Sequence, residues 1–401
     1  MFRCSLLAFA LFLAGITLTT AHASDAASTH IIGAYYPGDS AARYPIAQIP
    51  ADKLTHLFYA FAHIQHGQCV VASDADAHAH FAALAELKRK HPHLRTLISI
   101  GGWEAGGFSD AALTATNRKR FVASCVALFF DRNLKAFDGV DIDWEFPVYG
   151  GPPKLTARPQ DRRNMTALAR EFRRQLDAIG KARVQAFLLT AALPVGRLQS
   201  SGPYDPARSF ELAKLARTLD FMNLMTYDLG TAFSPVATFN APLREDKADP
   251  LDPQLRRWNN VEGGVEYYRQ HGVPANKLVL GVPFYGRGFR VTSDANLGLY
   301  QPYSAPFEAG DWRTIKARLL SDPKWQQHWH PTAQSPWLFN PGDHIFVSYE
   351  DPKSIGLRAQ LAKDAGMRGV FMWELTGDDD QQNLLQAMVR PFERPSALDQ
   401  R

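Results

Sequence analysis

The sequence predicts an α/β protein, a closed (β/α)8 TIM barrel with a small α+β insertion between its seventh and eighth strands. Eight short apolar runs recur along the chain, and most are followed by a helical pattern or a long loop. Strands that alternate with helices form parallel sheets with right-handed crossovers. Eight such units within 401 residues favour a closed barrel over an open sheet.

The predicted strands are short and rich in Val, Ile, Leu and aromatic residues, as buried parallel strands are. In chain order they are Ile31–Tyr35, His56–Phe61, Thr96–Ile100, Gly139–Asp143, Phe187–Ala192, Phe221–Met225, Leu278–Val282 and Gly369–Met372. Three intervening segments have a clear 3.6-residue period. They predict helices over Arg118–Phe130, Asp161–Ile179 and Asp351–Ala365. We expect the second helix to stop at Gly180 and the third to start with Asp351 as N-cap.

The connection between the last two strands is unusually long. It runs from Phe284 to Arg368, and its part from Phe289 to Val347 is rich in Trp, Pro, Gly and Asp. Structureless loops of this length are rare in compact domains. Residues 289–347 are therefore predicted to form an α+β insertion within the barrel domain.

The first 23 residues have the pattern of a signal peptide. Arg3 is followed by the apolar run Leu6–Ile16 and by Ala21-His22-Ala23, a small-x-small cleavage signal. A membrane anchor is the alternative, but the apolar run is shorter than the ~20 residues that span a bilayer. We expect residues 1–23 to be removed and residues 24–401 to form one secreted domain, extracellular or periplasmic, without a membrane contact.

Composition excludes several classes of protein. With 46% hydrophobic and 21% charged residues, the chain is not disordered, collagen-like or a disulfide scaffold. A net charge of +4 over this length does not indicate a nucleic-acid partner. Once residues 1–23 are removed, Cys69 and Cys125 remain, and either a bridge or two free thiols is compatible with the sequence. We expect a monomer.

The segment Asp138–Pro147 carries the most informative pattern. A strand has a period of two, so Asp141, Asp143 and Glu145 face one side and the residues between them face the other. Three carboxylates this close cannot all be ionised, so at least one is expected to stay protonated near neutral pH. A solvated acidic turn and a Mg²⁺ or Ca²⁺ site are the alternatives. The first does not fit the apolar residues between the acids, and the second lacks interleaved His or Asn.

Five motifs together resemble glycoside hydrolase family 18, the chitinases. The first is the D-x-x-D-x-D-x-E pattern of Asp138–Glu145, and each of the others follows a predicted strand. Those others are Ser99–Trp103, Met225–Asp228, Pro283–Arg287 and Phe371–Glu374. The insertion is similar to that of the deep-cleft chitinase subgroup. The resemblance covers nearly all of 24–401 and implies hydrolysis of β-1,4-N-acetylglucosamine linkages in chitin and chito-oligosaccharides, with no cofactor and no metal.

The resemblance also implies a catalytic set. Glu145 is expected to protonate the departing oxygen, while the substrate's own acetamido oxygen attacks the sugar carbon, as in retaining, substrate-assisted glycosidases. Asp143 would hydrogen-bond the acetamido N–H, stabilise the oxazolinium intermediate and share a proton with the deeper Asp141. Tyr227 would donate its phenol to the acetamido carbonyl.

Eight further residues are expected to bind or support the sugar chain. They are Trp373, Trp103, Asp228, Met225, Arg287, Phe61, Ser99 and Gly102. Trp373 would form the floor under the reacting sugar and Trp103 would stack on the leaving-group side, with core packing as the alternative. Arg287 is expected to bind sugar hydroxyls or Asp228, or to form a plain surface ion pair. Ser99 is expected to bind the inner carboxylate or merely backbone.

Two departures from the family pattern and two rival functions stay open. Ala34 and Phe146 stand where relatives commonly have Tyr, which leaves the reach of Tyr35 and Tyr36 undecided. A zinc site at the paired histidines of 78–80 or 328–330 lacks a third ligand. A chitinase-like lectin would bind without cutting, but it typically lacks the acid. An endo-β-N-acetylglucosaminidase acting on N-glycans is the enzyme alternative.

Overall fold

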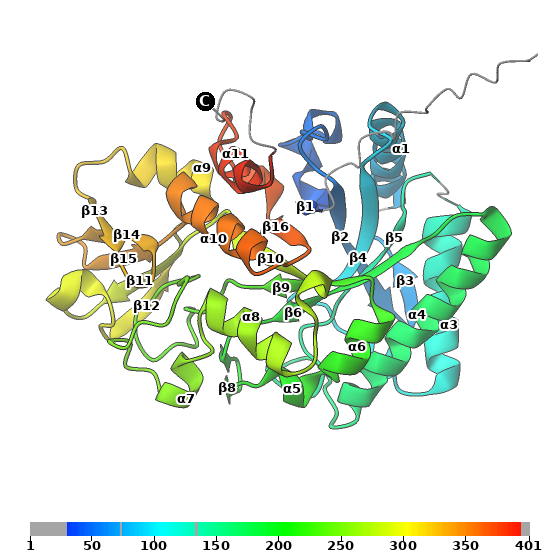
Figure 1. The fold of residues 1–401 in the computed structure, drawn as a ribbon, viewed down its shortest axis with the longest axis horizontal. Helices are drawn as coiled ribbons and strands as arrows, with labels where there is room; N and C mark the ends of the chain where they lie inside the picture. The colour runs from blue at the N-terminus through cyan, green and yellow to red at the C-terminus, as the bar shows by residue number, and fades with distance from the viewer. Residues whose placement is uncertain (1–29, 73, 133–134, 394–401) are drawn as a thin grey trace, which may run out of the picture.

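Eight parallel strands close into a barrel at the centre of the molecule (Figure 1). The computed structural model describes residues 30–393 apart from 73, 133 and 134. The barrel strands are β1 (Ile31–Pro37), β2 (His56–Gln65), β4 (Arg95–Gly101), β5 (Gly139–Asp143), β6 (Leu188–Pro194), β9 (Phe221–Met225), β10 (Leu278–Pro283) and β16 (Gly369–Trp373). Strand β1 pairs with both β2 and β16, which closes the ring. The predicted fold class is confirmed.

Helices cover the outside of the barrel and bury their apolar faces against it. The longer ones are α1 (Asp74–Lys90), α3 (Ala115–Val126), α4 (Asp161–Arg183), α6 (Leu212–Thr218), α8 (Val261–Gln270), α10 (Pro352–Asp364) and α11 (Asn383–Val389). Short ones lie in the loops: α2 (Phe108–Ala111), α5 (Pro206–Ser209), α7 (Pro253–Arg256) and α9 (Trp312–Thr314). Outside the insertion, two short strand pairs are antiparallel. In one, β3 (Gln68–Val70) pairs with β2, and in the other β7 (Leu198–Gln199) pairs with β8 (Gly202–Pro203).

Sequence and structure agree on how α10 starts and differ on how α4 ends. Asp351 caps α10 by accepting a hydrogen bond from the Ser354 backbone N–H, 2.7 Å away. The prediction that α4 stops at Gly180 is wrong, because the helix continues to Arg183. A Cβ at Gly180 would lie 2.5 Å from the carbonyl oxygen of Gln185. Gly180 therefore allows the chain after α4 to pack closely against the helix, and it does not end the helix.

The insertion is a five-stranded antiparallel sheet with its own small core. Its strands are β11 (Arg287–Val291), β12 (Tyr303–Phe307), β13 (Gln326–His330), β14 (Ser335–Asn340) and β15 (Ile345–Ser348), in the order β12-β11-β15-β14-β13. Phe289, Phe339 and Phe346 pack together in its core. In Figure 1 this sheet lies at the left of the barrel, on the side opposite α3 and α4. The sheet therefore adds a wall to one side of the barrel.

A disulfide bond joins Cys69 of β3 to Cys125 of α3, whose Cα atoms are 5.0 Å apart. This settles which of the two cysteine states the structure adopts. No helix within the described part of the chain is long and apolar enough to cross a membrane. The predicted signal segment, residues 1–23, lies outside the described residues.

Candidate active site

Strand β5 places the acidic row inside the barrel. Asp141 and Asp143 are buried, and Glu145 follows at the strand end, where it is partly exposed. The residues between them, Ile142 and Trp144, are buried as well. The period of two predicted this division into an acidic and an apolar face. The structure therefore gathers the acids at the carboxyl ends of the strands, where barrel enzymes place their active sites.

Asp141 is held by four donors. Its Oδ2 accepts hydrogen bonds from the hydroxyls of Tyr35 (2.8 Å) and Ser99 (2.7 Å). Its Oδ1 accepts from Thr190 Oγ1 (2.6 Å) and from Asn223 Nδ2 (3.4 Å). Burial raises the pKa of Asp141, and the four hydrogen bonds oppose that rise. The Ser99 contact was expected, whereas the reach of Tyr35 was left open by the sequence.

Asp143 has a different environment from Asp141. Burial raises its pKa well above the ordinary value, and the neighbouring Glu145 and Asp141 raise it further. Its Oδ1 is buried and has no hydrogen-bond partner among the described residues. An unpaired buried acceptor is costly, so this oxygen is suited to a donor that arrives with a ligand. The predicted sharing of a proton with Asp141 stays a prediction, since the four partners of Asp141 do not include Asp143.

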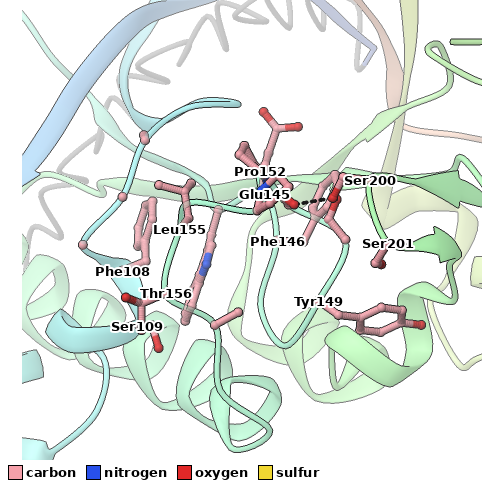
Figure 2. Close-up of a pocket in the computed structure, with 18 residues that line it drawn as sticks. Phe108, Ser109, Glu145, Phe146, Tyr149, Pro152, Leu155, Thr156, Ser200 and Ser201 are labelled. Atoms are coloured by element: carbon pink, nitrogen blue, oxygen red, sulfur yellow. Dashed lines mark hydrogen bonds between the residues drawn. The ribbon is translucent and has the colours of Figure 1, made fainter. Parts of the chain in front are cut away.

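Glu145 has the protonation behaviour of a general acid. Burial, and then the charge of Asp228, raise the pKa of Glu145 to about 8. A carboxyl with this pKa keeps its proton at neutral pH and can donate it. A separate pocket of about 320 Å³ lies beside this segment, and Glu145, Phe146 and Tyr149 are among the residues that line it (Figure 2). The Glu145 carboxylate points away from Ser109, Thr156 and Tyr149 in that view.

A groove of about 410 Å³ opens above the acidic row. Nine of the predicted site residues line it: Phe61, Trp103, Asp143, Glu145, Met225, Tyr227, Asp228, Arg287 and Trp373. Of the other three, Asp141 and Ser99 lie below it within the barrel, and Gly102 supports its wall. Most of the predicted site residues therefore border one groove.

Aromatic rings line the groove in two groups. In the first, Phe61 stacks on Trp373, with ring centroids 5.6 Å apart and an interplanar angle of 25°. In the second, the Trp103 ring centroid lies 6.1 Å from that of Phe146 and 6.2 Å from that of Phe233. Trp103 and Phe233 are 36% and 42% exposed, so core packing does not account for either ring. Exposed rings at a groove are typical platforms for the apolar faces of sugars.

Phe233 was missed by the sequence analysis. It lies in the loop after β9, outside every motif that carried the family resemblance. Its only signal in the sequence is that it is the one aromatic residue within positions 228–238. That signal alone does not place the ring opposite Trp103, because the approach depends on how the loop folds.

Two glycines let the backbone of β4 approach its neighbours closely. Gly101 has φ of 126°, and a Cβ there would lie 1.9 Å from the carbonyl oxygen of Asp143. Gly102 has φ of 97°, and its Cβ would meet the Phe61 ring at 2.9 Å. The Gly102 N–H donates to the Asp143 carbonyl at 3.0 Å. Larger residues here would displace both the acidic strand and one wall of the groove.

Asp228 is the hub of a polar cluster at the groove. Its Oδ1 accepts hydrogen bonds from the Tyr285 hydroxyl at 2.8 Å and from Arg287 Nε at 2.8 Å, and Arg287 Nη2 is 2.7 Å away. Of the roles considered for Arg287, the contact with Asp228 is therefore present. Tyr227 is buried beside this cluster, and burial followed by the charge of Tyr285 raises the pKa of Tyr227.

The paired histidines have other contacts. His80 Nδ1 lies 2.7 Å from the Tyr59 hydroxyl. His328 and His330 pack on the ring of Trp337, with centroids 4.9 and 6.3 Å apart. Among residues 30–393 as described, no group of three His, Cys, Asp or Glu side chains is arranged to hold a metal ion.

A closed parallel barrel with a row of carboxyl groups at the carboxyl ends of its strands defines the class: a TIM-barrel protein with an acidic site of the kind that barrel hydrolases use. The sequence profile of "Glycosyl hydrolases family 18" matches residues 31–378. The chain therefore belongs to glycosyl hydrolase family 18.

Relatives of known name agree with this assignment. The chain is 34% identical to Chitinase A1 of Niallia circulans over 91% of its own length and 59% of that protein. It is 34% identical to Chitotriosidase-1 of Mus musculus over 84% of its length and 70% of the relative. Among solved structures, it matches a family 18 N-acetylglucosaminidase from Paenibacillus barengoltzii with a TM-score of 0.79 and 29% identity, covering 90% of this chain and 99% of that one. The chain thus spans about three fifths of the Niallia protein.

Proposed function

We propose that this protein is a secreted chitinase that hydrolyses β-1,4 bonds between N-acetylglucosamine units in chitin and chito-oligosaccharides. The observation that carries the proposal is the row formed by Asp141, Asp143 and Glu145 beneath an aromatic-walled groove. Relatives named chitinases support the choice of substrate. The disulfide between Cys69 and Cys125 supports secretion, because such bonds persist in oxidising compartments.

The proposed reaction has two steps and retains the configuration at the sugar carbon. Glu145 gives its proton to the glycosidic oxygen as the C1–O bond breaks, and the substrate's acetamido oxygen bonds to C1. The resulting oxazolinium ion is positively charged. A water molecule then attacks C1 and breaks the C1–acetamido bond, while Glu145 takes the water's proton back.

The remaining catalytic residues hold the acetamido group in position. The unpaired Oδ1 of Asp143 suits the acetamido N–H, whose positive charge grows as the ring forms. Tyr227 keeps its proton because its pKa is raised, so it can donate to the acetamido carbonyl. Trp373 provides the floor under the reacting sugar, and Trp103 with Phe233 flanks the leaving portion.

The test is a time course on the hexamer of N-acetylglucosamine, with the anomers of fresh products followed by NMR. We expect cleavage that first releases the β-anomer, and no cleavage of the fully deacetylated hexamer, which has no acetamido nucleophile. Initial release of the α-anomer would overturn the mechanism. Binding without cleavage would indicate a lectin, and release of single sugars alone would indicate an N-acetylglucosaminidase. Release of high-mannose glycan from a glycoprotein in place of chitin cleavage would indicate an endo-β-N-acetylglucosaminidase.

A further inference from the structure

A buried asparagine outside every motif lies at the junction of three parts of the molecule. Asn240 is in the loop between β9 and α7 and has no exposed surface. Its Oδ1 accepts the Asp228 N–H at 2.9 Å, and its carbonyl oxygen accepts the Leu229 N–H at 2.9 Å. Its own N–H donates to Ser348 Oγ at 2.8 Å. One residue thus contacts the catalytic turn with two groups and the insertion with a third.

The turn that Asn240 holds is strained. Asp228 has φ of 56°, in the left-handed region that residues with a side chain rarely adopt. Such a conformation costs free energy and persists only where surrounding contacts enforce it. The consecutive N–H groups of Asp228 and Leu229 both donate to Asn240, so this residue supplies that enforcement.

The position of Asp228 matters for the acid. Its charge is the principal electrostatic neighbour that raises the pKa of Glu145, after burial. After burial, the charge of Glu145 also raises the pKa of Asp143, and the charges of both acids raise the pKa of Tyr227. On the opposite side, Asp228 is fixed by Tyr285 and Arg287. A displaced turn would therefore change the distance between two carboxyl groups in a site of low polarity.

The other side of Asn240 is anchored in the insertion and in α10. Ser348 is the last residue of β15 and is fully buried. The next loop residue, Ala241, accepts a hydrogen bond from the guanidinium of Arg358 in α10. Arg358 also donates to Ser335 Oγ of β14 at 3.0 Å. The loop that carries Asn240 is thus fixed to elements outside the catalytic turn.

We propose that Asn240 is a positioning residue, which holds the Asp228–Leu229 turn against β15 and thereby sets the distance between the Asp228 and Glu145 carboxyl groups. The inference rests on the proposed functions of these two acids. It gives the insertion a second role besides bringing Arg287 to the groove, because Ser348 of β15 accepts the Asn240 N–H. A purely structural asparagine would affect stability alone.

The test compares Asn240→Ala with Asn340→Ala, measuring thermal stability, kcat, KM and the pH dependence of kcat/KM on a chromogenic chito-oligosaccharide. Asn340 is a matched control, since it is buried and accepts two backbone N–H groups, of Gly342 and Asp343, in a turn of the insertion. We expect Asn240→Ala to lower kcat by about tenfold or more with little change in KM. The alkaline limb should move to lower pH as Asp228 moves away. Asn340→Ala should lower stability alone.

A second measurement separates this inference from the proposed function. The pKa of Glu145 can be followed by NMR in protein with labelled glutamate, whether or not the enzyme cuts chitin. We expect Asn240→Ala to lower that pKa by about half a unit or more. An unchanged Glu145 pKa would overturn the inference. If Asn240→Ala does not fold, Ser348→Ala decides, with a smaller shift in the same direction expected and no shift refuting the proposal.

Discussion

Two glutamates in this molecule show how a raised pKa can accompany different roles: Glu350 is fully enclosed, whereas Glu145 is partly exposed at the groove. Burial raises the pKa of both Glu145 and Glu350, and the charge of Arg358 opposes that rise at Glu350. Beside Glu350 stands Arg358, with Nη1 2.9 Å from the carboxylate and both side chains 0% exposed. Beside Glu145 stands another acid, Asp228, and the carboxyl faces a groove. A cation next to a buried carboxyl indicates a structural ion pair. A second acid next to a carboxyl that lines a groove indicates a candidate catalytic site.

The hydrogen-bond partners of the two regions differ in the same way. Arg358 donates to the backbone oxygens of Ala241 and Ser354 as well as to Ser335, so its charge is shared among three segments. In the groove, Asp143 keeps an oxygen without a partner. The junction around Arg358 also has buried polar atoms without a hydrogen bond among the described residues, Arg358 Nε and both Glu350 oxygens, but there a cation stands next to the carboxylate. The acidic row gathers like charges instead, and Asp143 lines the groove, where a donor on a substrate can reach its unpaired oxygen.

Among these variants, Glu145→Gln should have the largest effect on activity, and it tests the role of the glutamate at the groove. Glutamine keeps the shape of the side chain but cannot supply a proton at neutral pH. We expect kcat on the chito-hexamer to fall by about 10³-fold or more, while oligosaccharide affinity by calorimetry is largely kept. Glu350→Gln is the matched control, since it removes the same group from a site without substrate. Near-normal hydrolysis by Glu145→Gln would refute the assignment of the acid.

The same variant makes a prediction about stability, with the sign fixed by the raised pKa. A carboxyl whose pKa rises on folding favours the folded state at low pH, and this contribution is lost as pH rises from its ordinary value to about 8. Glu145→Gln should therefore be more stable than the parent at pH 8 and gain little at pH 4. Thermal melts across that range measure the difference.

Arg358→Met tests whether the Glu350–Arg358 pair contributes to stability. It leaves the buried Glu350 without its cation, and we expect a loss of about 3–5 kcal/mol in the free energy of unfolding. Urea titration measures this loss. The double variant Glu350→Gln with Arg358→Met should recover part of it, because no buried charge is then left unpaired. A double variant less stable than Arg358→Met would show that the pair is not the source of the loss.

The sequence predicted what depends on local periodicity and short motifs. The alternation along β5 placed Asp141, Asp143 and Glu145 on one face, and the apolar runs located the eight barrel strands. The sequence did not predict the positions of Phe233 and Asn240 at the site, because each contacts a partner that only the folded loops bring near. The end of α4 was also mispredicted. Gly180 marks close packing there, and its sequence context does not distinguish that from a helix stop.

The pH dependence of kcat/KM tests the raised pKa of Glu145 in the unmutated protein. Because the pKa of Glu145 is about 8, kcat/KM should hold through neutral pH and fall about tenfold per unit above that value. The fall reports loss of the proton that the leaving group needs. Circular dichroism at each pH serves as the control for unfolding. If kcat/KM instead begins to fall near pH 5, a group other than Glu145 determines the alkaline side of the pH profile.

Ser99→Ala tests the inner end of the acidic row and should have the smallest effect. Asp141 would keep three of its four donors, so we expect a loss of about 1 kcal/mol in stability and a fall in kcat of less than about tenfold. Thr190→Val, which removes a donor from the other oxygen, is the matched variant. Similar small losses would fit an Asp141 that supports its neighbours from within the hydrogen-bond network. A loss as large as that of Glu145→Gln would place Ser99 in the chemistry itself, since one redundant hydrogen bond cannot account for it.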